Sequence, residues 1–352
     1  MSVESPPFGP RSAPARRSPG RRLLDRALAR PSLASLIATV AVSVFFAVQA
    51  PSLVSTEGLA TVLDVGALLG IGGVAVAMLL IAGQIDLTVG VVGVGSSLVA
   101  ALLVQAGWGL WPALAVSLLS ALLVGLVNGV LVVSTGLPSF LVTLATFLVL
   151  QGTALAVTDA VAGRASVGGL SAAPDWASVK AVFGATLEVG DGVFRVSLLW
   201  WVGVTALASW VLWRTRFGSA VMGVGGAPRP ARELGVPVTR TTVVLFLVTA
   251  AAGWLIGTLG LVRFSGVMVD PTLGNEIEFL VVAVIGGCLL SGGYGSAVGA
   301  ALGALLYAVA REGIVLAGWD PRWFQAFLGV LLLLALLANG VVRRRLLAVP
   351  RS

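Results

Sequence analysis

The stretch Arg214–Arg240, RTRFGSAVMGVGGAPRPARELGVPVTR, decides how the chain is oriented. It carries five arginines against one acid, Glu233, and it separates two long apolar runs. A basic loop between two membrane spans is retained on the cytoplasmic side of the membrane. The loop therefore predicts on which side of a membrane each neighbouring segment lies.

Apolar residues dominate the composition. The 352 residues are 58% hydrophobic and 11% charged, with a mean hydropathy of +1.03, whereas soluble domains carry about 25% charge. The net charge of +7 comes from basic clusters in 1–30, 214–240 and 343–351. Such clusters beside spans set orientation and contact anionic lipid. The sequence therefore predicts an integral membrane protein that meets membrane lipid and no nucleic acid.

Continuously apolar runs of roughly 20 residues suit helical spans and do not alternate as barrel strands do. An even count of ten places all three basic clusters on the cytoplasmic side and the weakly charged segment 158–197 outside. The predicted fold is an all-α integral membrane protein with about ten transmembrane helices, both termini cytoplasmic and some helices broken by Gly-rich segments. The predicted spans are 32–50, 59–82, 87–106, 110–133, 138–157, 198–213, 241–262, 277–291, 296–317 and 323–340.

The predicted organisation has three parts. Residues 1–30, rich in Pro, Ser and Arg, form a disordered basic cytoplasmic tail. Residues 31–342 form the polytopic transmembrane domain, and 343–352 form a second basic cytoplasmic tail. Within the external loop 158–197, Gly190-Asp191-Gly192 predicts a hairpin turn. That loop either receives a partner protein or serves as a plain connector.

Two glycine-rich segments interrupt the apolar runs. GQIDLTVG (83–90) separates the second and third spans, and GGCLLSGGYGS (286–296) separates the eighth and ninth. Aligning Gly83 with Gly286 also pairs Thr88 with Ser291. Paired breaks in the two halves of a transporter mark its pathway, although two tight interhelical turns would leave the same pattern.

Polar side chains inside the apolar runs are the candidates for a substrate pathway. An acid in hydrocarbon costs about 2.5–3.5 kcal/mol, so Asp86 is expected to cap a helix, to face an aqueous cavity or to lie at the membrane interface, and it is well placed as the N-cap of the third span. A hydroxyl stripe follows Pro138 on one helix face, where it contacts a polyol or bonds its own backbone. Asn275, Glu276 and Glu278 are weaker candidates, expected at the outer interface. The predicted pathway residues are Gln84, Asp86, Thr88, Asn128, Ser139, Thr143, Thr146, Gln151 and Ser291.

Patterns for catalysis and nucleotide binding are absent from the sequence. It contains no G-x-x-x-x-G-K-[ST] motif, and its one lysine, Lys180, lies in the external loop. It has no histidine and a single cysteine, Cys288, so no metal motif arises. Acids suited to ion coupling are sparse, because only Asp64 and Asp86 lie within or beside the interior of the first five spans. The sequence predicts a non-enzymatic protein without cofactor or metal, driven by energy from another subunit.

Three ordered elements resemble those of the permease subunits of bacterial ATP-binding-cassette (ABC) importers for monosaccharides of the ribose, xylose, arabinose and galactose group. GQIDLTVG is similar to the family's G-x-I/F-D-L-S-V-G element. LPSFLVTLATFLVLQG (137–152) and EFLVVAVIGGCLLSGGYGSAVGAALGALL (278–306) are similar to its second and third elements. The resemblance spans about 55–340. It implies a sugar-import permease of the cytoplasmic membrane, working by alternating access with a separate ATPase, an external sugar-binding protein and a second permease copy.

Arg214–Arg240 resembles that family's coupling loop, in which a G-G-N-x-E-A-A-R-x-x-G-I pattern forms a short helix that docks on the ATPase. The sequence departs from the pattern at Ala227, Arg229 and Pro230. Proline is tolerated in a first helical turn, and Gly235 is a suitable terminator. The resemblance implies a coupling role for Gly225, Gly226, Arg229, Ala231, Arg232, Glu233 and Gly235.

Other functions stay open at this point. The alternative within transport is an ion-coupled secondary transporter of a small polar solute. A membrane enzyme for lipid-linked sugar would need catalytic acids or a metal site, which the sequence does not show. A diffusive channel would need no ATPase partner.

Overall fold

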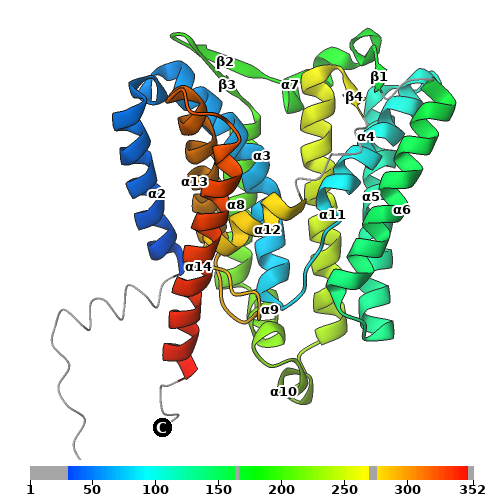
Figure 1. The fold of residues 1–352 in the computed structure, drawn as a ribbon. Helices are drawn as coiled ribbons and strands as arrows, with labels where there is room; N and C mark the ends of the chain where they lie inside the picture. The colour runs from blue at the N-terminus through cyan, green and yellow to red at the C-terminus, as the bar shows by residue number, and fades with distance from the viewer. Residues whose placement is uncertain (1–30, 163–165, 269–275, 348–352) are drawn as a thin grey trace, which may run out of the picture.

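The computed structural model describes residues 31–162, 166–268 and 276–347, and in them the chain forms 13 α-helices and two small strand pairs. Each of the ten predicted apolar runs contains a helix (Figure 1). These helices are α2 (Pro31–Gln49), α3 (Thr56–Ile81), α4 (Val89–Gln105), α5 (Leu110–Thr135), α6 (Ser139–Ala162), α8 (Ser197–Arg214), α11 (Val238–Phe264), α12 (Glu276–Ile285), α13 (Ala297–Leu316) and α14 (Trp323–Leu347).

Seven of these helices are long and apolar enough to cross a membrane, among the residues searched: α2, α3, α5, α6, α11, α13 and α14. The expectation of a helical membrane protein is therefore confirmed. The other three are α8, which contains four tryptophans, and the shorter α4 and α12, with 17 and 10 residues. Figure 1 shows that α4 and α12 both begin midway between the upper and lower ends of the molecule. The eighth predicted span extended too far, because α12 ends at Ile285.

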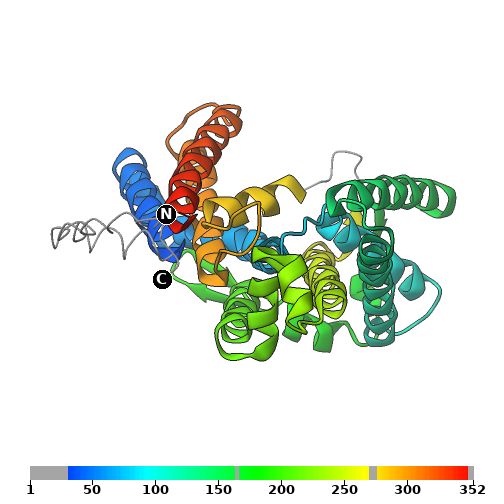
Figure 2. The ribbon, with the colours of Figure 1, turned by 90° about the horizontal axis from the view of Figure 1, so that it is seen from below.

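Helix α3 is the central element and is buried along most of its length. Figure 2 shows α2, α13 and α14 gathered on one side of it and α4, α5 and α6 on the other. Glycines in α3 let neighbouring helices approach it closely. A methyl group added at Gly72 would lie 2.5 Å from the ring of Phe279 on α12. The buried core therefore lies along α3, and the most exposed helices are those at the two ends of the row.

Glycines inside the helices allow close packing between neighbouring helices within the bundle. A methyl group added at Gly125 of α5 would lie 2.6 Å from the carbonyl oxygen of Phe246 on α11, and one added at Gly129 would lie 3.0 Å from the Cα of Val243. Gly299 and Gly303 likewise press the backbone of α13 against α12. Close backbone approach of this kind is what small-xxx-small spacing provides between membrane helices.

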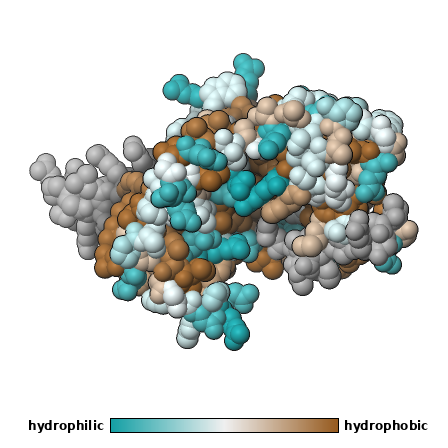
Figure 3. All heavy atoms as spheres, turned by 90° about the horizontal axis from the view of Figure 1, so that it is seen from above, coloured by the Kyte–Doolittle hydropathy of each residue, from teal (hydrophilic) through white to brown (hydrophobic). Residues whose placement is uncertain are grey.

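Residues 166–197, part of the segment predicted to be external, form a cap on the upper face of the structure. β1 (Ser166–Gly168) pairs antiparallel with β4 (Gly266–Met268), and α7 (Trp176–Phe183) packs on α5 and α11. The predicted hairpin is confirmed: β2 (Thr186–Val189) pairs with β3 (Gly192–Arg195) around the turn Gly190-Asp191. A 3₁₀ turn, η2 (Leu170–Ala172), precedes α7, and another, η1 (Pro51–Val54), precedes α3. Figure 3 shows hydrophilic residues across the middle of this face, between hydrophobic flanks.

Polar contacts hold this cap to the helices beneath it. The Asp64 carboxylate on α3 pairs with Arg263 of α11 at 2.7 Å and with Arg195 of β3 at 3.3 Å. The backbone N–H groups of Leu110 and Trp111 donate to the two carboxylate oxygens of Asp175, each at 2.8 Å. The N-cap of α5, Gly109, has no side chain, so Asp175 supplies the acceptor that a helix start requires.

Removing the Asp175 carboxylate is expected to loosen the cap. Burial raises the pKa of Asp175, but hydrogen bonds from backbone N–H groups, chiefly those of Trp111 and Leu110, together outweigh it and hold the pKa below its ordinary value. The carboxylate therefore stabilises the fold above its unfolded pKa, and this stability is lost as pH falls through the lower folded pKa. We expect Asp175→Ala to cost about 1 kcal/mol near neutral pH, measured as a lower midpoint of thermal unfolding in detergent. An unchanged midpoint would contradict this role.

Candidate functional site

The first glycine-rich segment turns the chain back into the molecule. Helix α3 ends at Ile81, and Gly83 takes a left-handed φ of 76°. Its N–H donates to Leu80 O, and the N–H of Gln84 donates to Leu79 O, the bonds of a Schellman cap. The chain then rises to α4, which begins about midway between the upper and lower ends of the molecule (Figure 1). A helix start is thus placed inside the membrane-spanning bundle.

Asp86 lies just before this helix start and is 2% exposed. The N–H and the hydroxyl of Thr88 donate to its Oδ1 at 2.8 and 2.6 Å, and the hydroxyl of Thr249 on α11 donates to its Oδ2 at 2.6 Å. The expectation that Asp86 is the N-cap was wrong, because α4 begins later and Thr88 occupies that position. Asp86 instead joins the segment just before α4 to α11 through its hydrogen bonds with Thr88 and Thr249.

Glu276 caps α4 from a distant part of the sequence. The N–H of Val91 in the first turn of α4 donates to Glu276 Oε1 at 2.8 Å across 185 positions. A methyl group at Gly90 would lie 2.7 Å from the same oxygen, so a larger residue there would displace the Glu276 carboxylate. The placement of Glu276 at the outer interface was wrong: it is 5% exposed, because α12 begins inside the bundle. Glu278 is partly buried on the same helix, and Asn275 lies outside the described residues.

The polar contacts continue from Thr88 into α5 and α6. Asn128 Nδ2 donates to Thr88 Oγ1 at 3.1 Å, and the Thr146 hydroxyl donates to Asn128 Oδ1 at 2.7 Å. Ser139 Oγ accepts from the N–H of Ile85 at 2.9 Å. We call the side chains that make hydrogen bonds around the start of α4 the α4-start network: Asp86, Thr88, Asn128, Ser139, Thr143, Thr146, Thr249 and Glu276.

Six of the nine predicted pathway residues belong to this network. Thr249 was missed by the sequence reasoning, because it is one of several threonines in α11 and nothing in the sequence distinguished it from the others. The Thr143 hydroxyl donates to its own i−4 carbonyl at 2.9 Å, and the Thr146 hydroxyl shares its proton between Asn128 Oδ1 and its i−4 carbonyl, which is 3.1 Å away. These residues are thus already paired with protein groups, and their visible contacts position α4, α5, α6 and α11 against one another.

The three other predicted residues lie elsewhere. Gln84 and Ser291 lie on the two glycine-rich turns, and Gln151 lies partly exposed on α6. The pairing of Thr88 with Ser291 was wrong: the N-cap of α13 is Ser296, whose Oγ accepts from the N–H of Gly299. The second turn is longer. It also begins with a Schellman cap, in which Gly287 holds the position that Gly83 holds in the first turn.

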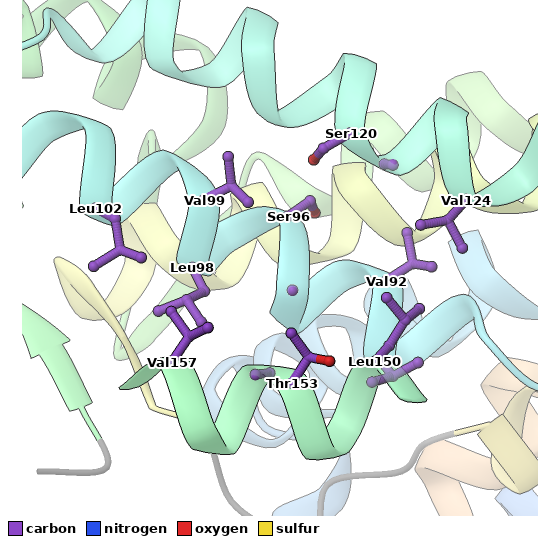
Figure 4. Close-up of a pocket in the computed structure, with 14 residues that line it drawn as sticks. Val92, Ser96, Leu98, Val99, Leu102, Ser120, Val124, Leu150, Thr153 and Val157 are labelled. Atoms are coloured by element: carbon purple, nitrogen blue, oxygen red, sulfur yellow. The ribbon is translucent and has the colours of Figure 1, made fainter. Parts of the chain in front are cut away.

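A crevice of about 200 Å³ lies between α4, α5 and α6 (Figure 4). Its wall is apolar apart from the hydroxyls of Ser96, Ser120 and Thr153. Ser96 and Ser120 already donate to backbone carbonyls of their own helices. Sites for polar ligands place several convergent polar groups around the ligand, so this crevice lacks the lining that a sugar would need.

The Arg-rich loop forms two short helices at the lower face (Figure 1): α9 (Arg216–Gly226) and α10 (Pro228–Glu233). Thr215 caps α9, because its hydroxyl accepts from the N–H of Gly218 at 3.1 Å. Gly235, at a φ of 81°, ends α10 with N–H bonds from Gly235 to Arg232 O and from Val236 to Ala231 O. The expected short helix with a glycine terminator is confirmed.

Helix α10 projects its charged side chains away from the bundle. Ala231 is buried, whereas Arg229, Arg232 and Glu233 are exposed. Leu234 is 85% exposed at the tip. The sequence reasoning missed Leu234, although an isolated large apolar residue in a polar loop was a usable signal. An exposed arginine-rich knob with an apolar tip is suited to contact another protein.

Comparisons with known proteins agree with these features. The family model described as "Branched-chain amino acid transport system / permease component" matches residues 58–336. The chain is 34% identical to the fructose import permease of Rhizobium meliloti over 79% of this chain and 76% of that protein. It is 26% identical to the ribose import permease of Escherichia coli, over 91% and 97%, and 26% identical to the galactose/methyl galactoside import permease of Haemophilus influenzae, over 62% and 63%. No solved structure matches significantly.

Proposed function

This chain belongs to the family described as the branched-chain amino acid transport system permease component, and we propose that its own cargo is a monosaccharide, pentose- or hexose-like. It is a multi-pass membrane subunit of a bacterial ABC importer, not an enzyme, and it binds no cofactor because a separate ATPase uses the ATP. The cargo rests on one observation: the fructose, ribose and galactose permeases align with most of this chain.

The proposed topology has ten spans with both termini cytoplasmic. Seven helices suit full spans, and α4, α8 and α12 complete the count. This places α10 in the cytoplasm and the strand-bearing cap outside, as the basic loop requires. The tails 1–30 and 348–352 lie outside the described residues; the helix α14 itself continues to Leu347, so Arg343–Arg345 continue that helix.

The proposed mechanism is alternating access in a pair of permeases, identical or different. ATP binding closes the two ATPases, which pull on α10 and rock helix groups against each other. The exposed position of α10 and its confirmed glycine terminator support the coupling assignment of Gly225–Gly235. The exposed apolar sides of α2, α6 and α14 suit lipid and a second permease copy.

The proposed pathway passes the starts of α4 and α12, where the α4-start network lies. This proposal rests on the burial of two carboxylates at mid-height, since acids within spans are otherwise costly. The network residues shape the passage by holding four helices in place. The more exposed Gln84, Gln151 and Ser291 are proposed to meet the passing sugar.

Uptake energetics test the function directly. We expect the chain to co-purify with a nucleotide-hydrolysing subunit, and uptake of radiolabelled D-fructose into cells to continue when ionophores collapse the ion gradients while ATP is retained. An ion-coupled transporter would lose uptake under the same conditions, because its gradient is gone. A channel would equilibrate the sugar without ATPase. Either result would overturn the proposal.

A further inference from the structure

Three glycine-rich segments that are far apart in sequence meet beneath the lower end of α3. The N–H of Gly293, in the α12–α13 turn, donates to Ile81 O at 2.7 Å. Gly225 of α9 lies against both groups: a methyl group added there would clash with Ile81 O and lie 2.5 Å from the Gly293 nitrogen. A methyl group at Gly292 would lie 2.8 Å from the Cα of Gly83. We call these five residues the glycine junction.

The junction is made of backbone rather than side chains. Ile81 O is one of the carbonyls that the end of α3 leaves without a helical partner, and the second glycine-rich turn supplies the donor. Backbone groups packed at this distance have no side-chain rotamers to absorb a displacement. Movement of α9 therefore shifts the end of α3 and the α12–α13 turn together.

The junction also reaches both carboxylates at the start of α4. Asp86 follows Gly83 by three residues along the first turn. Glu276 lies at the other end of α12, a single ten-residue helix about 15 Å long that ends next to the second turn. A displacement at the junction is thus carried to the α4 start by two routes: the first turn and the rigid α12.

We propose that the glycine junction transmits the movement of α9 and α10 to the start of α4, and that Gly225 and Gly293 are positioning residues for transport. The inference rests on the proposed function, in which α10 receives movement from the ATPase. The alternative outcome is that the junction only packs helices and does not move with nucleotide state.

A matched pair of substitutions on α9 distinguishes the effect of filling the junction from the effect of replacing a glycine in this helix. Gly225→Ala places a methyl group in the junction, whereas Gly223→Ala on the same helix meets nothing within 4 Å. A second pair controls for the backbone strain that alanine causes at a positive φ. Gly292→Ala (φ 76°) enters the junction, and Gly136→Ala (φ 68°), at the end of α5, carries similar backbone strain in open space.

The test uses the complete complex of permease, ATPase and binding protein in liposomes, with D-fructose uptake and ATP hydrolysis measured together. We expect Gly225→Ala and Gly292→Ala to assemble and hydrolyse ATP, with sugar transported per ATP falling about tenfold, within the usual range of coupling between sites. Gly223→Ala and Gly136→Ala should keep the wild-type ratio. A wild-type ratio in both junction variants would overturn the inference.

The wild-type protein offers a second readout that does not depend on variant folding. Cys288, the one cysteine of the chain, is buried in the α12–α13 turn. We expect its alkylation rate by N-ethylmaleimide in the complex to change about fivefold or more with a non-hydrolysable ATP analogue. An unchanged rate in a complex that transports D-fructose would overturn the junction alone. Absence of ATP-driven uptake in the wild type would instead overturn the proposed function.

Discussion

Reversing the charge of Arg232 is expected to abolish most ATP-driven uptake while the protein stays inserted in the membrane. Arg232 is exposed on α10, away from the buried contacts of the bundle, so its loss should not unfold the chain. Arginine is enriched among interface residues whose removal costs about 2 kcal/mol or more, and Arg232→Glu adds repulsion to that loss. Uptake should fall about 30-fold or more at limiting ATPase, measured in membranes with matched permease content.

Arg232→Lys is the matched control, because it keeps the positive charge while removing the planar guanidinium. It should retain more uptake than Arg232→Glu. Wild-type uptake in Arg232→Glu would remove the coupling assignment. Deleting 225–235 should also abolish uptake, but the point substitution is cleaner because the deletion also removes Gly225 from the glycine junction.

Thiol labelling tests on which side of the membrane α10 lies. Leu234→Cys places a thiol at an 85% exposed tip, while Cys288 is buried. A membrane-impermeant maleimide should label the thiol introduced at position 234 in inverted vesicles and not in intact cells. Labelling in intact cells would place the knob outside and contradict both the topology and the coupling mechanism.

Truncating Asp86 is expected to cause the largest loss of stability among the α4-start residues. Asp86→Ala leaves two buried donors without an acceptor, the N–H and the hydroxyl of Thr88, while the Thr249 hydroxyl loses one of its two acceptors and keeps Phe246 O. Each unsatisfied buried donor costs about 1–3 kcal/mol. The midpoint of thermal unfolding in lipid nanodiscs should fall well below that of the wild type, and uptake should fall with it because α4 loses its position.

Asp86→Asn distinguishes hydrogen bonding from charge. The amide oxygen accepts from both groups of Thr88, and the amide nitrogen donates to the Thr249 hydroxyl, which still donates to Phe246 O at 2.9 Å. We therefore expect Asp86→Asn to unfold within a few degrees of the wild type. If it unfolds as early as Asp86→Ala, the negative charge at the α4 start carries the stability, and the hydrogen-bond account is wrong.

Local patterns determined much of this protein before any contact was known. Apolar runs predicted the helices, because burial in lipid requires every backbone group to be bonded within its own segment. Gly235 predicted the end of α10, because a left-handed cap depends on one residue. The orientation inferred from the basic clusters stays a prediction. The polar stripe on α6 was also visible, because helical spacing places its hydroxyls on one face.

Only the tertiary structure decided which distant groups meet. Glu276 looked like an interface residue because its apolar run was long enough for a span, whereas α12 begins inside the bundle and places that carboxylate on the N–H of Val91. The contacts of Thr249 with Asp86, and of Gly225 with Ile81 and Gly293, join segments that no periodicity connects. Composition and spacing describe one helix at a time. These contacts depend on the level within the bundle at which several helices begin and end.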